Sequence, residues 1–247
     1  MAFADDSLEP EVPARPPSLF GSVREALSDC FYNSWRLVPV NLVWGLWFIL
    51  VLGTWSGVNL LAASILVPVL ALPLAGLARM AGLATRREAV HISDALDPLR
   101  RRPRAVIVSA IVFTVAFVIL GVNVVTGLAV GGLIGAALAT TAVWGLVVLA
   151  GFGVTWWPLL TDPARDVLTA KNIARLCSLL LLAHPLRMGL LVVIVGAVML
   201  ASTILFAAVL TVSVAFVMLV AAHYVLPAAD RLEERMGLRV TRSGEDA

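Results

Sequence analysis

The stretch RMAGLATRREAVHISDALDPLRRRPR, residues 79–104, decides how this chain is arranged. Seven of its residues are arginines, and it lies between two apolar blocks that are each long enough to cross a lipid bilayer. Short loops rich in Lys and Arg stay on the cytoplasmic side of a membrane during insertion. The stretch therefore predicts the orientation of the apolar blocks on both of its sides.

The composition predicts an integral membrane protein. Hydrophobic residues make up 60% of the 247 residues, charged residues make up 14%, and the mean hydropathy is +0.97. Soluble domains have about 45–50% apolar and about 25% charged residues. The pI of 8.8 does not indicate a nucleic-acid partner, because the charged residues lie outside the apolar blocks and mark the topology.

Six apolar blocks are predicted to span the membrane within a domain of residues 18–227: residues 37–54, 58–77, 105–125, 133–160, 188–206 and 208–226. The last two come from one apolar run, which is roughly twice the length of a single span and has no strong turn signal at its division. Residues 1–17 carry carboxylates and prolines, the opposite of a secretory signal, and are predicted to form a disordered cytoplasmic tail. Residues 228–247 are predicted to form a charged cytoplasmic tail.

With six spans, all 18 Lys and Arg residues fall on one side of the membrane, which the positive-inside rule makes cytoplasmic. The predicted fold is an all-α, polytopic membrane helical bundle of three hairpins joined by cytoplasmic amphipathic helices. These helices are expected after Ser18, after a capping box of Thr85 and Glu88, and after Asp162 with Pro163. Lys171 is the only lysine, which is typical of a GC-rich bacterial genome, so we expect a bacterial plasma-membrane protein with both termini in the cytoplasm.

The order of amphipathic segment, boundary and apolar hairpin occurs three times along the chain. An internal duplication would produce this order, as in many transporters. The ordinary pattern of any six-span protein with cytoplasmic connections would produce it as well.

The spans offer little catalytic chemistry. His223 is the only ionisable residue in the predicted blocks, and it is either a snorkelling or capping histidine or part of a proton relay. The sequence has no HExxH, CxxC, GxSxG or phosphate-binding glycine loop, so we expect neither an enzyme, nor a cofactor, nor a metal site. Polar residues in the spans either bridge helices or line a path for an uncharged solute, the candidates for such a path being Asn41, Asn59 and Asn123.

Several short motifs occur in a fixed order between residues 19 and 187: Phe31-Tyr32, Leu37 with Asn41 and Trp44, Pro73 with Leu77, Glu88 with Asp94, Trp157-Pro158-Leu159-Leu160, Lys171-Asn172-Ile173-Ala174 and His184-Pro185. In this order the chain resembles the YesL family of small bacterial membrane proteins, a domain of unknown function often found beside carbohydrate-uptake genes. The chain has Ala95 and Leu96 after Asp94, where that family tends to an aromatic residue.

The resemblance implies an accessory or regulatory role in carbohydrate uptake, with subunits of an ABC transporter or a second copy of the chain as partners in addition to the lipid bilayer. The residues expected to contact a partner at the cytoplasmic face are Arg86, Arg87, Asp94, Trp157, Lys171 and Asn172. The alternative function is a carrier or channel for an uncharged small solute.

Overall fold

The structure is a computed structural model that describes residues 18–57, 66–205 and 208–236. Over these residues the chain is helical and contains no strand. The long helices are α2 (Ser34–Gly57), α4 (Ala71–Thr85), α6 (Pro103–Val130), α7 (Gly132–Thr161), α9 (Pro185–Ile204) and α11 (Val214–Arg235). The shorter ones are α1 (Leu19–Tyr32), η1 (Val67–Leu70), η2 (Ile92–Leu96), α5 (Asp97–Arg101), η3 (Pro163–Arg165), α8 (Ala170–Ala183) and the π-helical turn η4 (Val209–Ser213).

Six helical segments of the described chain are long and apolar enough to cross a membrane: Ser34–Thr54, Val67–Thr85, Pro103–Val130, Gly132–Thr161, Pro185–Ile204 and Leu210–Arg235. Two of them continue beyond the predicted blocks at the charged end of the molecule. The segment expected to end at residue 77 runs on to Thr85 and so includes Arg79, and the last one passes Pro227 and ends at Arg235. The predicted tail at residues 1–17, the first eight residues of the predicted block 58–77, the division between the last two blocks at residues 206–207 and residues 237–247 of the predicted charged tail lie outside the described residues.

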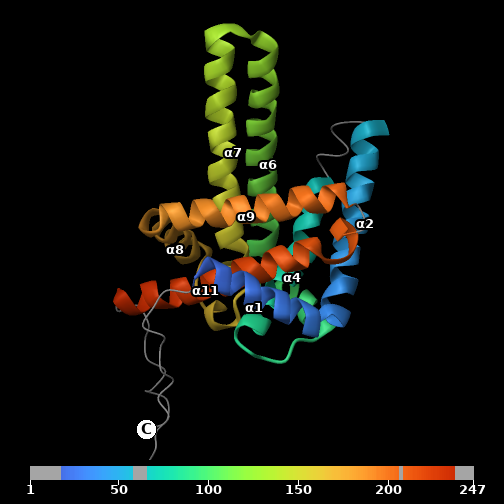
Figure 1. Ribbon diagram of the computed structural model, residues 1–247, viewed down its shortest axis with the longest axis vertical. Coiled ribbons are helices and arrows are strands. Elements are labelled where there is room, and N and C mark those ends of the chain that lie inside the picture. The colour runs from blue at the N-terminus through green and yellow to red at the C-terminus, as the bar shows by residue number, and fades with distance from the viewer. Residues whose placement is uncertain (1–17, 58–65, 206–207, 237–247) are drawn as a thin grey trace, which may run out of the picture.

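Helices α6 and α7 form an antiparallel hairpin that projects from the rest of the molecule (Figure 1). The connection is made by Gly131 and Gly132, both of which have positive φ angles, a conformation that glycine adopts without strain. A Cβ atom added at Gly127 would lie 2.7 Å from the backbone oxygen of Gly135, so glycine lets the two helices approach closely. Only 17% of the most apolar part of each helix is buried.

The core of the molecule lies around α4 and α11. The most apolar parts of these segments are 61% and 78% buried, and α4 packs against α11 as well as against α7. In the view of Figure 1, α9 and α11 run side by side in opposite directions and lie across the direction of the α6–α7 hairpin. The long helices therefore do not all run parallel to one another.

The predicted helix after Thr85 does not form as expected. The hydroxyl of Thr85 donates to the carbonyl of Ala81, so Thr85 ends α4 instead of capping a new helix. The chain is non-helical up to His91, whose backbone N–H donates to the carboxylate of Asp94 at the start of η2. Pro98 lies in the first turn of α5, a position that needs no backbone N–H.

The flanking helices α1 and α8 start at side-chain caps. The Ser18 hydroxyl accepts from the backbone N–H of Gly21, as predicted, whereas α8 begins later than predicted, at Thr169. The predicted cap at Asp162 forms, but the helix that it starts is the short η3. Helix α1 packs against α11 and leaves Phe20, Leu27 and Phe31 exposed on its other face.

Candidate functional site

The charged ends of four helical segments meet below the core. Residues from the end of α4, from α5, from η3 and from the end of α11 form a network that we call the ionic layer: Arg79, Arg86, Asp97, Arg101, Arg102, Asp162, Arg165, Asp166, Asp230 and Glu233. The five arginines and five carboxylates balance one another in charge. The layer therefore joins segments that are far apart in sequence without adding net charge to the interior.

Asp162 is the centre of the first half of the layer. Its carboxylate is fully buried and accepts two bonds from Arg86, with Nε–Oδ1 and Nη2–Oδ2 distances of 2.7 and 2.6 Å. It also accepts from Arg165 and from the backbone N–H of Ala164. Burial by itself raises the pKa of Asp162, but the bond from Arg86 and the charges of Arg165 and Arg86 outweigh it and leave the pKa below the ordinary value.

Arg165 joins Asp162 to the end of α11. Its guanidinium donates to Asp230 at 2.6 Å and to both carboxylate oxygens of Glu233 at 2.8 and 3.1 Å. Burial lowers the pKa of Arg165, but its hydrogen bonds to Glu233 and the charges of the three neighbouring carboxylates raise the pKa further than burial lowers it. The side chain is 3% exposed and remains charged at any ordinary pH.

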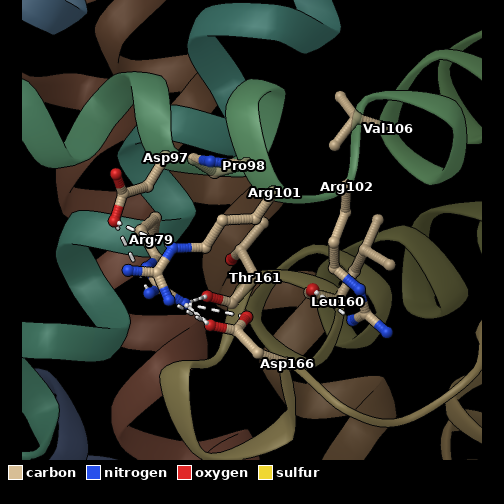
Figure 2. Close-up of a pocket in the computed structure, with 9 residues that line it drawn as sticks. All are labelled: Arg79, Asp97, Pro98, Arg101, Arg102, Val106, Leu160, Thr161 and Asp166. Carbon is tan, nitrogen blue, oxygen red and sulfur yellow. Dashed lines mark hydrogen bonds and ion pairs between the residues drawn. The ribbon is translucent and has the colours of Figure 1, made fainter.

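Arg79 is the centre of the second half (Figure 2). Its Nη1 donates to the carbonyl of Thr161 at 3.0 Å and to both oxygens of Asp166 at 3.1 and 3.2 Å, and its Nη2 lies 3.7 Å from Asp97. Arg101 contacts the same two carboxylates, at 3.6 Å for Asp97 and 3.2 Å for Asp166. These side chains leave a space of about 10 Å³, which is about the size of one water molecule, so this half of the layer is packed and is not a ligand pocket.

Arg102 completes the layer through backbone groups. It donates to the carbonyl of Leu160 at 3.2 Å and to that of Arg165 at 3.4 Å, next to the N-terminus of α6. Removing one partner of a buried ion pair typically costs about 3–5 kcal/mol, because the other charge stays buried without compensation. The ionic layer can therefore act as a clamp that holds the ends of α4, α7 and α11 and the start of α6 together.

The predicted partner-contact residues are distributed over several environments. Arg86 lies in the ionic layer and is bonded to Asp162, while Arg87 is exposed and has a positive φ of 58°. Asp94 holds the start of η2, as described above. Lys171 and Asn172 are exposed in the first turn of α8.

Trp157 differs from these residues because it lies in the core. It is 5% exposed, and its ring centre is 5.9 Å from that of Phe113 on α6. A side chain in this position holds α7 against α6. It is not presented at the surface.

Two of the three asparagines of the possible solute path, Asn41 and Asn123, are described, and they lie in different parts of the structure. Asn41 is fully buried, donates to the carbonyl of Leu210 at 2.9 Å and accepts from the backbone N–H of Ala215 at 2.8 Å. Both ends of its amide are thus engaged with the irregular turn that leads into α11. Asn123 lies on the projecting part of α6, and Asn59 lies outside the described residues.

His223 connects α11 to α1. It is 8% exposed, its Nε2 is 2.9 Å from Asp29 and its Nδ1 is 3.7 Å from Glu25, both on α1. The side chain therefore bridges α11 and α1 in the described structure.

The described residues contain no group of three or more His, Cys, Asp or Glu side chains that could hold a metal ion. Cys30 and Cys177 are both buried and free, on α1 and α8. Burial raises the pKa of the Cys177 thiol to about 12, so this thiol is protonated and unreactive at neutral pH.

From the sequence, the arginines are predicted to be topology signals or partner contacts, and the ionic layer is not predicted. The spacing of the charged residues nevertheless indicates which charges share a helical face. Arg79 and Arg86 are seven residues apart and share one face of a helix that continues past the apolar block. Asp162, Arg165 and Asp166, as well as Asp230 and Glu233, have the spacing of three or four that places charges on one helical face.

The six apolar helices of the described chain define an all-helical, multi-pass membrane protein. Comparison of the chain with protein-family models, with curated proteins and with solved structures finds no match.

Proposed function

We propose that the chain is a non-enzymatic, multi-pass protein of the bacterial plasma membrane that acts as an accessory or regulatory factor for carbohydrate uptake by an ABC-type transporter. The link to carbohydrate uptake rests on the motifs that the chain shares with the YesL family. The placement in a membrane rests on the six apolar helices.

The proposed topology is three hairpins with both termini in the cytoplasm. The pairs are α2 with α4, α6 with α7, and α9 with α11, and the connections through α5 and α8 lie at the cytoplasmic surface. Two features support this arrangement: the positive-inside rule, and the ionic layer, which gathers Arg79, Arg101 and Arg165 at one end of the helices. Ends that are bonded to one another must lie on the same side of the membrane.

The single observation that carries the proposal is the internal charge balance of the ionic layer. Because the layer neutralises its own arginines, the exposed cations around it have few carboxylates to pair with among the described residues. These cations are Arg87, Arg100, Arg104, Lys171 and Arg175. Exposed cations on a rigid support are suited to contact an acidic surface of another protein.

The carrier alternative has less support. A solute path needs polar groups that face a cavity, and the amide of Asn41 is used in bonds to the backbone. A cavity of about 660 Å³ between the apolar helices is lined mainly by aliphatic and aromatic side chains, and among the described lining residues the polar groups are the Thr114 hydroxyl and the indole N–H groups of Trp44 and Trp157. An apolar lining of this kind does not favour the passage of a sugar.

Co-purification in mild detergent tests the proposal. Transporter subunits identified by mass spectrometry should be recovered with the wild-type chain and should decrease at least about tenfold with Lys171→Glu, which places a carboxylate at an exposed position. Arg24→Glu, an exposed reversal on α1, is the matched control and should leave recovery unchanged. Solute flux into proteoliposomes that contain the chain alone would instead establish the carrier.

A further inference from the structure

A groove runs between α2, the start of α4 and the η2 segment. Its volume is about 490 Å³, within the range of about 300–1,000 Å³ that small-molecule sites occupy. Its walls include Val43 and Trp47 of α2, Leu72 of α4, and Ile92 and Leu96 of η2. Among the described lining residues, Ser93 has a polar side chain, and the indole N–H of Trp47 donates to the carbonyl of Leu66.

The η2 segment reaches this groove because it folds back along α4. A Cβ atom added at Gly76 would lie 2.6 Å from the carbonyl oxygen of Ala95, so the two backbones touch there. Gly76 is nine residues before the end of α4, which is about 14 Å along the helix axis. Ile92 and Leu96, which are about half exposed, thus lie level with the apolar part of α4 and above the ionic layer.

Two arginines lie within four residues of lining residues, on two walls of the groove. Arg36 lies four residues before Val40 and seven before Val43, so it shares their face of α2. Its guanidinium carbon is 4.3 Å from the centre of the Trp35 ring, and its buried Nε has no hydrogen-bond partner among the described residues. Arg100 is exposed and follows Leu96 by four residues, at the end of the same wall.

The two carboxylates near Leu96 are already engaged. Asp94 accepts from the backbone N–H of His91 at 2.7 Å, and Asp97 is bonded within the ionic layer to Arg79 and Arg101. The groove therefore combines an apolar channel with a cationic mouth. This is the complement of a hydrocarbon chain that ends in an anionic group.

We propose that the groove binds one acyl chain of an anionic phospholipid of the cytoplasmic leaflet, with the lipid phosphate between Arg36 and Arg100. An acyl chain matches the lining, because a groove at this depth of a membrane protein is not filled by water. An anionic headgroup matches the mouth, because each basic residue near the surface favours anionic lipid about fivefold. The proposal goes beyond the proposed function and rests only on the membrane placement of α2 and α4.

Lipid analysis of the purified protein tests this site. The wild-type chain, purified from membranes of mixed phosphatidylglycerol and phosphatidylethanolamine and washed extensively in detergent, should retain about one phospholipid per chain, enriched in phosphatidylglycerol. Arg36→Gln with Arg100→Gln should reduce that enrichment by about 25-fold, as two independent fivefold effects. Arg87→Gln, which removes an exposed arginine away from the groove, should leave the enrichment unchanged.

A second pair of variants tests the channel itself. Val43→Trp fills the groove and should abolish retention of the lipid, whereas Val148→Trp, at an exposed position of α7, should not affect retention. Retained lipid with the bulk composition of the membrane, or equal retention by Val43→Trp and wild type, would overturn the proposal. Recovery of transporter subunits is measured separately for Val43→Trp and Val148→Trp, which leave every exposed cation in place, and is expected to persist in both, so a failure here is distinct from a failure of the proposed function.

Discussion

Helix α11 and the α6–α7 hairpin are both apolar enough to cross a membrane, but the structure uses them differently. The mean hydropathy of the most apolar part is 2.0 for the segment of α11 and 2.9 for that of α6, whereas the buried shares are 78% and 17%. The more apolar helix is thus the less buried one. Apolarity decides that a helix enters the bilayer, but not that it enters the protein core.

Small residues and charged ends explain which helices become central. The core helix α4 contains Ala75, Gly76, Ala78, Ala81 and Gly82, whose size lets neighbouring backbones come close. Its end carries arginines that are bonded to the ends of α7 and α11. The outer faces of α6 and α7 carry valine, isoleucine and leucine instead, which are as well solvated by lipid tails as by other helices.

The largest difference in stability between a core variant and a hairpin variant is expected when an ion pair of the ionic layer is broken. Asp162→Asn leaves Arg86 and Arg165 without their shared buried carboxylate and should lower the free energy of unfolding by about 3–5 kcal/mol. Thermal unfolding in detergent, followed by circular dichroism, measures this loss. Val148→Ala on the exposed face of α7 is the control and should change stability by less than about 0.5 kcal/mol. Equal effects of the two substitutions would remove the distinction between core and hairpin.

Val148→Lys tests whether the exposed face of the hairpin lies in lipid. Val148 is near the middle of α7 and is 65% exposed. A lysine at the centre of a membrane span costs about 2.5–3.5 kcal/mol, but an exposed lysine in water costs almost nothing. Insertion efficiency in a microsomal assay distinguishes the two environments, and unchanged insertion would mean that the hairpin lies outside the bilayer.

Glycine-to-alanine substitutions should change the stability of the protein in opposite directions in the two regions. Gly76→Ala places a methyl group 2.6 Å from the carbonyl oxygen of Ala95 and should destabilise the protein by about 1–3 kcal/mol. Gly121→Ala on α6 meets no atom within 4 Å and should stabilise the helix by about 0.5–1 kcal/mol. Unfolding temperatures of the two variants measure the signs, and a stabilised Gly76→Ala would show that η2 does not pack on α4.

Asn41→Ala should destabilise the protein by about 1–3 kcal/mol, because it leaves the carbonyl of Leu210 and the N–H of Ala215 without the bonds that Asn41 makes to them. Asn123→Ala on the hairpin is the matched control and should be nearly neutral. The same unfolding assay applies to both. If Asn123→Ala proved as harmful as Asn41→Ala, the hairpin would have a polar contact of comparable importance.

The smallest effect is expected from pH. The pKa of Asp162 is lower in the folded protein than in the unfolded chain, so its stabilising contribution is present above about pH 4 and is lost as the pH falls through the folded value. The difference in unfolding temperature between wild type and Asp162→Asn should therefore be constant from about pH 5 to 8 and decrease below about pH 4. A difference that grew in acid would contradict the assigned direction of the shift.

Much of the fold could be predicted because hydropathy is a local property of the sequence. Each of the six predicted blocks has a helix that corresponds to it, and the caps at Ser18 and Asp162 were predicted correctly. The segment after Thr85 was predicted incorrectly. Thr85 and Glu88 fit the sequence pattern of a capping box, but α4 extends to Thr85, whose hydroxyl donates to the carbonyl of Ala81. The position of that continuation depends on partners of Arg79 and Arg86 that are more than 70 residues away in the chain.

The sequence by itself determined the all-helical class, the number of apolar helices and the position of the cations outside the predicted apolar blocks, because each follows from composition and spacing within a short window. Only the tertiary structure decided which helices form the core, which arginines are paired within the ionic layer, and that Trp157 and Asn41 serve packing. The physical reason is that burial and ion pairing depend on distances between residues far apart in the chain. A charge or an amide has the same appearance in the sequence whether its partner is another side chain, a lipid or water.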